Sequence, residues 1–153
     1  MKLPRFVKYW MPAIAWMALI FIGSTDVLSA EHTSRFLVPF LRWLDPQISW
    51  ATLNAVQTII RKLGHLTEYA ILAALLWRAL RSGMWWSSKM SVLFAIVCLA
   101  CAIFAASDEF HQSFVPSRTS SFHDVMIDVC GVLIGLAICV ALATRKAVKE
   151  SRV

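Results

Sequence analysis

Charged residues are scarce in this sequence, at 16% of its 153 residues, whereas soluble domains carry about 25%. Glycine and proline are scarce as well, with five residues each, and no segment is a low-complexity linker or repeats another. Mean hydropathy is +0.66, which is more apolar surface than a soluble domain of this size can hide. The composition therefore excludes an ordinary soluble domain and predicts an all-α membrane protein, with one domain over residues 1–153.

Common catalytic motifs are also missing: the sequence has no nucleophile motif, no glycine-rich phosphate loop and no HExxH. The four cysteines all lie inside apolar runs, where thiols usually act as small packing residues: Cys98, Cys101, Cys130 and Cys139. The net charge is +6, but the basic residues form short clusters beside apolar runs. We therefore expect no nucleic-acid binding.

Four apolar runs are each near the roughly 20 residues that cross a bilayer core. They cover about residues 9–26, 61–80, 90–107 and 123–143, and predict a polytopic protein with four transmembrane helices. The first run follows a basic tail, as a signal peptide would, but Leu28 fits poorly at the minus-three position of a cleavage site. An uncleaved first span is expected.

Basic residues predict the orientation of these spans. Ten of the fifteen lie in the two tails and in the loop between the second and third spans, and five lie on the other side with eight of the nine acids. Both termini are therefore expected in the cytoplasm. The first outer loop, about 27–60, has apolar residues at helical spacing in 34–46 and 49–62. These segments either lie in the outer membrane interface or form a loop packed on the bundle.

The unusual polar residues converge at the outer ends of three spans. His65, Glu68 and Tyr69 belong to the second span; Asp108, Glu109 and Gln112 end the third; Ser121, Asp124 and Asp128 begin the fourth; Lys62 and Arg118 flank them. Ser121 is a suitable N-cap, and Asp124 three residues later completes a capping-box-like pattern. Asp124 and Asp128, four residues apart, share a helix face.

This convergence favours a functional site. A charged side chain well inside a bilayer costs about 3 kcal/mol or more, and Asp128 is five residues into its span. The competing interpretation is that these groups solvate helix ends and pair with one another, as Arg118 with Asp124. That interpretation suits each residue taken alone better than it suits the whole set.

The same residues resemble the VanZ-like family of small bacterial membrane proteins. The family pattern begins with a basic residue and a His–Tyr pair on one helix. Asp–Glu followed by Gln comes next, and then a Pro–Gly–Arg turn. It ends with a serine and an aspartate, an Asn or Asp four residues later, and two glycines. It is matched over about residues 61–136 by Lys62, His65, Tyr69, Asp108, Glu109, Gln112, Pro116, Arg118, Ser121, Asp124, Asp128, Gly131 and Gly135, with Ser117 in place of the turn glycine. The family is named for a protein associated with teicoplanin resistance. The resemblance implies a bacterial inner-membrane location and these site residues, but no reaction.

Five carboxylates near the outer surface indicate an acid-rich site: Glu68, Asp108, Glu109, Asp124 and Asp128. Either some are protonated or a cation completes the site, and a divalent cation is one candidate cofactor. The candidate metal ligands are His65, Asp108 and Asp124.

The first hypothesis is a site that binds the polar head of an envelope lipid or lipid-linked glycan, with Lys62 and Arg118 holding phosphate. Glu68, Tyr69, Gln112, Ser121 and Asp128 complete its ligand-binding candidates. The second hypothesis is a hydrolase or transferase for lipid-linked phosphate or glycosyl groups, in which Asp124 with Asp108 or Glu109 holds a metal or acts as acid and base. His65 would then carry the proton. An ion or proton transporter is third, because the inner halves of the spans are almost free of polar residues. Apart from the bilayer no partner is specified, and the oligomeric state is open, although the GxxxG of Gly131 and Gly135 favours helix packing within the monomer over a dimer.

Overall fold

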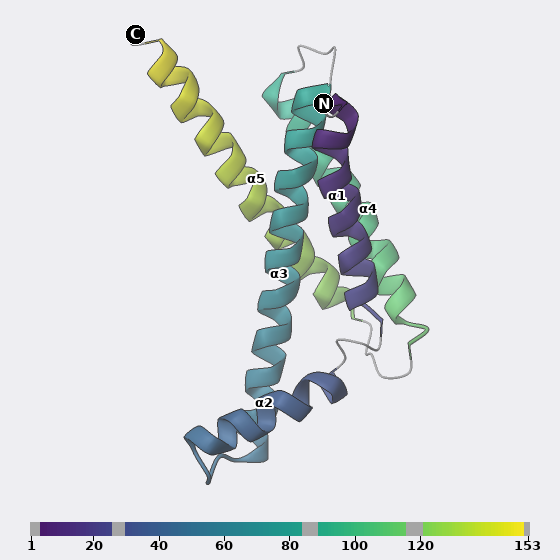
Figure 1. The fold of residues 1–153 in the computed structure, drawn as a ribbon, viewed down its shortest axis with the longest axis vertical. Helices are drawn as coiled ribbons and strands as arrows, with labels where there is room; N and C mark the ends of the chain where they lie inside the picture. Colours follow the sequence, from purple (N-terminus) through teal and green to yellow (C-terminus); the bar gives the residue numbers. More distant parts are fainter. Residues whose placement is uncertain (1–3, 26–29, 84–88, 116–120, 152–153) are drawn as a thin grey trace.

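The computed structural model describes residues 4–25, 30–83, 89–115 and 121–151. In these ranges every regular element is a helix, which confirms the all-α prediction (Figure 1). The helices are α1 (Arg5–Gly23), α2 (Ala30–Leu44), α3 (Trp50–Gly83), α4 (Met90–Gln112) and α5 (Phe122–Glu150).

Helix α3 is the centre of the fold, because α1, α2, α4 and α5 all contact it. Its closest neighbour is α5, which runs in the same direction and crosses it at Gly131 and Gly135. A Cβ added at Gly131 would overlap the carbonyl oxygen of Leu66, and one added at Gly135 would overlap that of Ala70. The GxxxG therefore brings two backbones of the same chain together, as small residues do between membrane helices.

Three helices are long and apolar enough to cross a membrane in the described part of the chain: α1, α4 and α5. These three helices contain most of the predicted spans 9–26, 90–107 and 123–143. Most helix ends differ from the predicted span ends by one to several residues. The predicted span 61–80 lies inside α3, which does not meet the same criterion. His65, Glu68 and Arg78 lower its mean hydropathy. The fold is that of a polytopic membrane protein with three clear spans rather than four.

Most described residues of the predicted first outer loop are helical. Residues 30–44 form α2, which continues through Pro39. The second expected segment, 49–62, is not separate from the bundle: it forms the first turns of the 34-residue α3. No proline or glycine stands between Trp50 and Lys62 to end the helix before it reaches the apolar run.

The core is a single cluster of apolar side chains between α1, α3, α4 and α5, centred on Tyr69, Leu72, Val97 and Leu136. Outside it, large apolar side chains such as Leu19, Leu99 and Ile103 are exposed along the helices. An apolar outer surface of this extent suits a lipid environment. The start of α1 and the end of α5 lie at one end of the bundle (Figure 1). The opposite end gathers the end of α1, the end of α4 and the start of α5 beside α3.

Candidate functional site

Every buried polar or charged side chain in the described residues belongs to the end of the bundle where α1 and α4 finish and α5 begins. They are Ser24, His65, Asp108, Glu109, Gln112, Asp124 and Asp128. The sequence predicts all of them except Ser24. Because four helices contribute, the site exists only in the folded bundle.

Asp108 joins α4 to the end of α1. Its Oδ2 accepts a hydrogen bond of 2.7 Å from the Ser24 hydroxyl. It also accepts one of 3.2 Å from the Gln112 amide, one turn along α4. The same amide donates to the Ser24 hydroxyl at 3.2 Å. Ser24 thus connects two predicted residues, and its only sequence signal is its place at the end of the first span.

His65 and Asp128 form a second pair, between α3 and α5. The His65 Nδ1 lies 3.1 Å from the Asp128 Oδ1, and the Asp128 side chain is 1% exposed. A buried carboxylate on one ring nitrogen fixes the orientation of the imidazole. It leaves Nε2 as the nitrogen that can face a ligand.

Arg61 and Asp124 form a third pair, one turn farther out on the same two helices. The Arg61 Nη2 lies 2.6 Å from the Asp124 Oδ2. Lys62 is the cationic residue that the sequence predicts on α3, but it is exposed and makes none of these contacts. Arg61 is four residues before His65 and so shares its face, whereas Lys62 is turned away by about 100°. This four-residue spacing is the feature of the sequence that could have identified Arg61.

Ser121 caps α5, although not through the expected reciprocal pattern. Its hydroxyl accepts the backbone N–H of His123 at 3.2 Å. The backbone N–H of Ser121 is bound by the carboxylate of Glu109, not by Asp124. Glu109 of α4 therefore completes the cap from another helix, which leaves Asp124 for Arg61.

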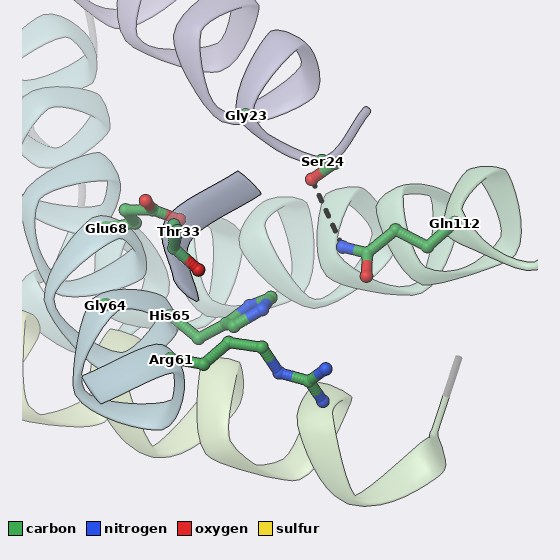
Figure 2. A pocket seen from close by; sticks show the side chains of 8 residues that line it. All are labelled: Gly23, Ser24, Thr33, Arg61, Gly64, His65, Glu68 and Gln112. Atoms are coloured by element: carbon green, nitrogen blue, oxygen red, sulfur yellow. Dashed lines mark hydrogen bonds between the residues drawn. The ribbon is translucent and has the colours of Figure 1, made fainter. Parts of the chain in front are cut away.

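A pocket of about 150 Å³ opens beside these pairs. It is lined by Gly23, Ser24, Thr33, Arg61, Gly64, His65, Glu68 and Gln112 (Figure 2). The side chains of Arg61 and His65 extend from α3 into the space, and Ser24 and Gln112 meet across its far side (Figure 2). Asp108 lies behind Ser24 and Gln112, and Asp128 lies behind His65.

Of the predicted residues that the structure describes, only His65, Glu68 and Gln112 line the pocket itself. Tyr69 is fully buried one turn beyond His65, and its hydroxyl has no hydrogen-bond partner in the described part of the chain. Arg118, the expected partner of a carboxylate, lies outside the described residues, as does the Pro116–Ser117–Arg118 turn.

Metal ligation has no preformed site in the ranges that the structure describes. No group of three or more His, Cys, Asp or Glu side chains there is placed to hold an ion. Of the candidate ligands, Asp108 is engaged by Ser24 and Gln112, and Asp124 by Arg61. Hydrogen bonding and charge pairing are what these side chains offer a ligand.

Comparison with protein families identifies the family of the chain. Residues 9–143 match the model of the VanZ/LLP1 family. The chain belongs to the VanZ/LLP1 family. The VanZ/LLP1 match includes most of α1, all of α2, α3 and α4, and most of α5, so it contains all the side chains of the site. It also extends well beyond the 61–136 of the sequence resemblance. Searches of curated proteins and of solved structures found no significant match.

Proposed function

We propose that the pocket binds the polar head group of an envelope lipid or lipid-linked glycan. The observation that carries the proposal is the convergence of all seven buried polar side chains of the described residues on one end of an apolar bundle, around a pocket. Placing a charge inside a bilayer costs about 3 kcal/mol or more. Solvating helix ends does not require five ionisable groups that are more than nine-tenths buried.

The chemistry of the lining supports a head group as the ligand. Ser24, Thr33 and Gln112 offer neutral donors and acceptors, as sugar or glycerol hydroxyls require. Arg61 offers a planar guanidinium that suits a phosphate, and its pairing with Asp124 holds it in position. A volume of about 150 Å³ accommodates a phosphate with a small substituent rather than a whole glycan.

The orientation forms part of the same proposal. Basic residues Arg5, Lys8, Arg81 and Arg145 stand at the end of the bundle opposite the site, which the positive-inside rule assigns to the cytoplasm. Helix α3 then supplies the fourth span through its stretch near 61–80, with its polar residues turned to the bundle. The termini are cytoplasmic, and the pocket faces the outer leaflet of a bacterial cytoplasmic membrane.

Gly64 provides the test. It lines the pocket, and a Cβ added there meets nothing within 4 Å. The leucine side chain of Gly64→Leu should therefore fill the pocket without a clash. The helix should not be strained either, because leucine is a better helix former than glycine by roughly 0.8 kcal/mol. Gly64→Ala is the matched control, since it changes the same backbone position but adds only a methyl group.

The measurement is mass spectrometry of lipids that remain bound to the protein purified from its own membrane. One lipid species should be retained by the wild type and by Gly64→Ala, and lost from Gly64→Leu at unchanged helix content. Equal retention of every species by all three proteins would contradict head-group binding in this pocket.

A second candidate function is hydrolysis or transfer on the bound lipid, and the His65–Asp128 pair favours it. A buried carboxylate that orients an imidazole beside a pocket is a common general-base arrangement. Incubating the wild type with its retained lipid should then change the mass of that lipid, and His65→Gln should retain the lipid unchanged. If the wild type does not change the mass of the lipid, catalysis is contradicted and only the binding function is supported.

A further inference from the structure

Helix α2 has an apolar face that the rest of the described chain does not cover. Phe36, Phe40, Trp43 and Leu44 recur along this face at helical spacing and are all exposed, with Phe36 at 82% and Trp43 at 77%. Leu37 and Leu41, on the flank toward α3, are only half-buried. Arg35 and Arg42 occupy the opposite side of the helix.

Two contacts fix where the ends of α2 lie relative to α3. Near its start, Thr33 lines the pocket with Arg61 and His65. Near its end, the guanidinium of Arg42 lies 4.5 Å from the centre of the Trp50 ring, at the first residue of α3. Helix α2 therefore runs obliquely across the lower part of α3, from the pocket to the first residue of α3 (Figure 1).

Distances along α3 relate these two contacts to membrane depth. At about 1.5 Å per residue, His65 is about 20 Å and Trp50 about 42 Å from Arg78 at the basic end. The hydrocarbon core is about 30 Å thick, and the head groups extend the bilayer to about 40–45 Å. With Arg78 at the inner boundary of the hydrocarbon core, the pocket lies in the outer part of the core, and Trp50 lies about 12 Å beyond its outer boundary, at or just past the outer limit of the head groups. Helix α2 spans the depth between them.

We propose that α2 is an interfacial helix whose apolar face lies among the lipids of the outer leaflet, so that the pocket beneath it is reached from that leaflet and not from water. The apolar face continues the lipid-facing surface of the bundle, where Phe110, Phe114 and Phe122 are exposed at the same end. Aromatic side chains and arginine together are typical of this depth. Access from the leaflet rests on the proposed function; the placement of α2 does not.

Spin labels test the placement, in protein reconstituted in phospholipid vesicles and with its four native cysteines replaced by alanine. Labels are attached to Phe36→Cys and Phe40→Cys on the apolar face, and to Arg35→Cys as the matched control on the opposite face. The ratio of collisions with oxygen, which dissolves in lipid, to collisions with a water-soluble nickel chelate should be several-fold higher at 36 and 40 than at 35. A label on Gly64→Cys, inside the pocket, should also favour oxygen.

Three results would overturn the proposal. Equal access of the nickel chelate to positions 36, 40 and 35 would place α2 in water. Protection of 36 and 40 from both reagents would mean that a second copy of the chain, not lipid, covers the face. Strong nickel access at 64 would mean a pocket open to water. None of these results depends on head-group binding. Head-group binding is tested separately, by lipid retention in Gly64→Leu.

Discussion

The ion pair between Arg61 and Asp124 should be worth more than an ordinary surface pair. The Asp124 side chain is 4% exposed and that of Arg61 29%. Removing one partner of a buried pair costs about 3–5 kcal/mol, because the other charge is left without compensation. Here Arg61 is only partly buried, and the first turn of α5 gives Asp124 about 0.3–1 kcal/mol of helix-dipole stabilisation. We therefore expect Arg61→Gln to lower the free energy of unfolding by about 2–3 kcal/mol.

The control is the adjacent residue on the same helix. Lys62→Gln removes the same charge from an exposed position and should change stability by no more than about 0.5 kcal/mol. The assay is unfolding in mixed micelles with increasing dodecyl sulfate, followed by loss of helical circular dichroism. Asp124→Asn and the double variant complete a cycle, whose coupling energy should be about 1–3 kcal/mol. Equal effects of Arg61→Gln and Lys62→Gln, or no coupling, would refute the reasoning.

Three further predictions concern packing, the buried tyrosine and topology. Gly131→Ala should cost about 1–3 kcal/mol, since its Cβ would overlap a backbone carbonyl of α3, whereas Gly64→Ala should be neutral or stabilising in the same unfolding assay; equal effects would contradict the close crossing. Tyr69→Phe should raise stability by about 1–3 kcal/mol, since its buried hydroxyl has no partner in the described chain; a loss of stability would mean that the hydroxyl is bound by water or ligand. Reporter fusions after Gly83 should read cytoplasmic and those after Pro46 external; the reverse would invert the orientation.

The site was largely predictable because membrane burial restricts where polar residues are tolerated. Six of the seven buried polar side chains in the described residues follow from asking which ionisable or amide groups interrupt the apolar runs. Ser24 escaped because a serine at the end of a span is ordinary. Its partner, Asp108, is 84 residues away, so only the tertiary structure gives its role.

The sequence was misleading where a pattern suggested a partner nearby in the chain but the actual partner lies on another helix. The Ser121–Asp124 spacing suggested a self-contained cap, yet Glu109 of another helix binds the Ser121 N–H. Lys62 is the basic residue that the sequence pattern selects at the start of the span, and helical geometry adds its neighbour Arg61 on the face of His65. The length of α3 was missed because hydropathy detects the apolar stretch of a helix and not the amphipathic turns that extend it.

The glycine crossing and the charged pairs are parts of one helix interface. Arg61 meets Asp124 and His65 meets Asp128, so that successive pairs are spaced by four positions on both helices. Leu66 meets Gly131, and Ala70 meets Gly135, at the same spacing directly beyond the His65–Asp128 pair. The glycines thus set how closely α3 and α5 approach, and that distance in turn sets both charged pairs. A methyl group at Gly131 would have to separate the helices next to the His65–Asp128 pair, so a purely steric change at the crossing should also weaken the site.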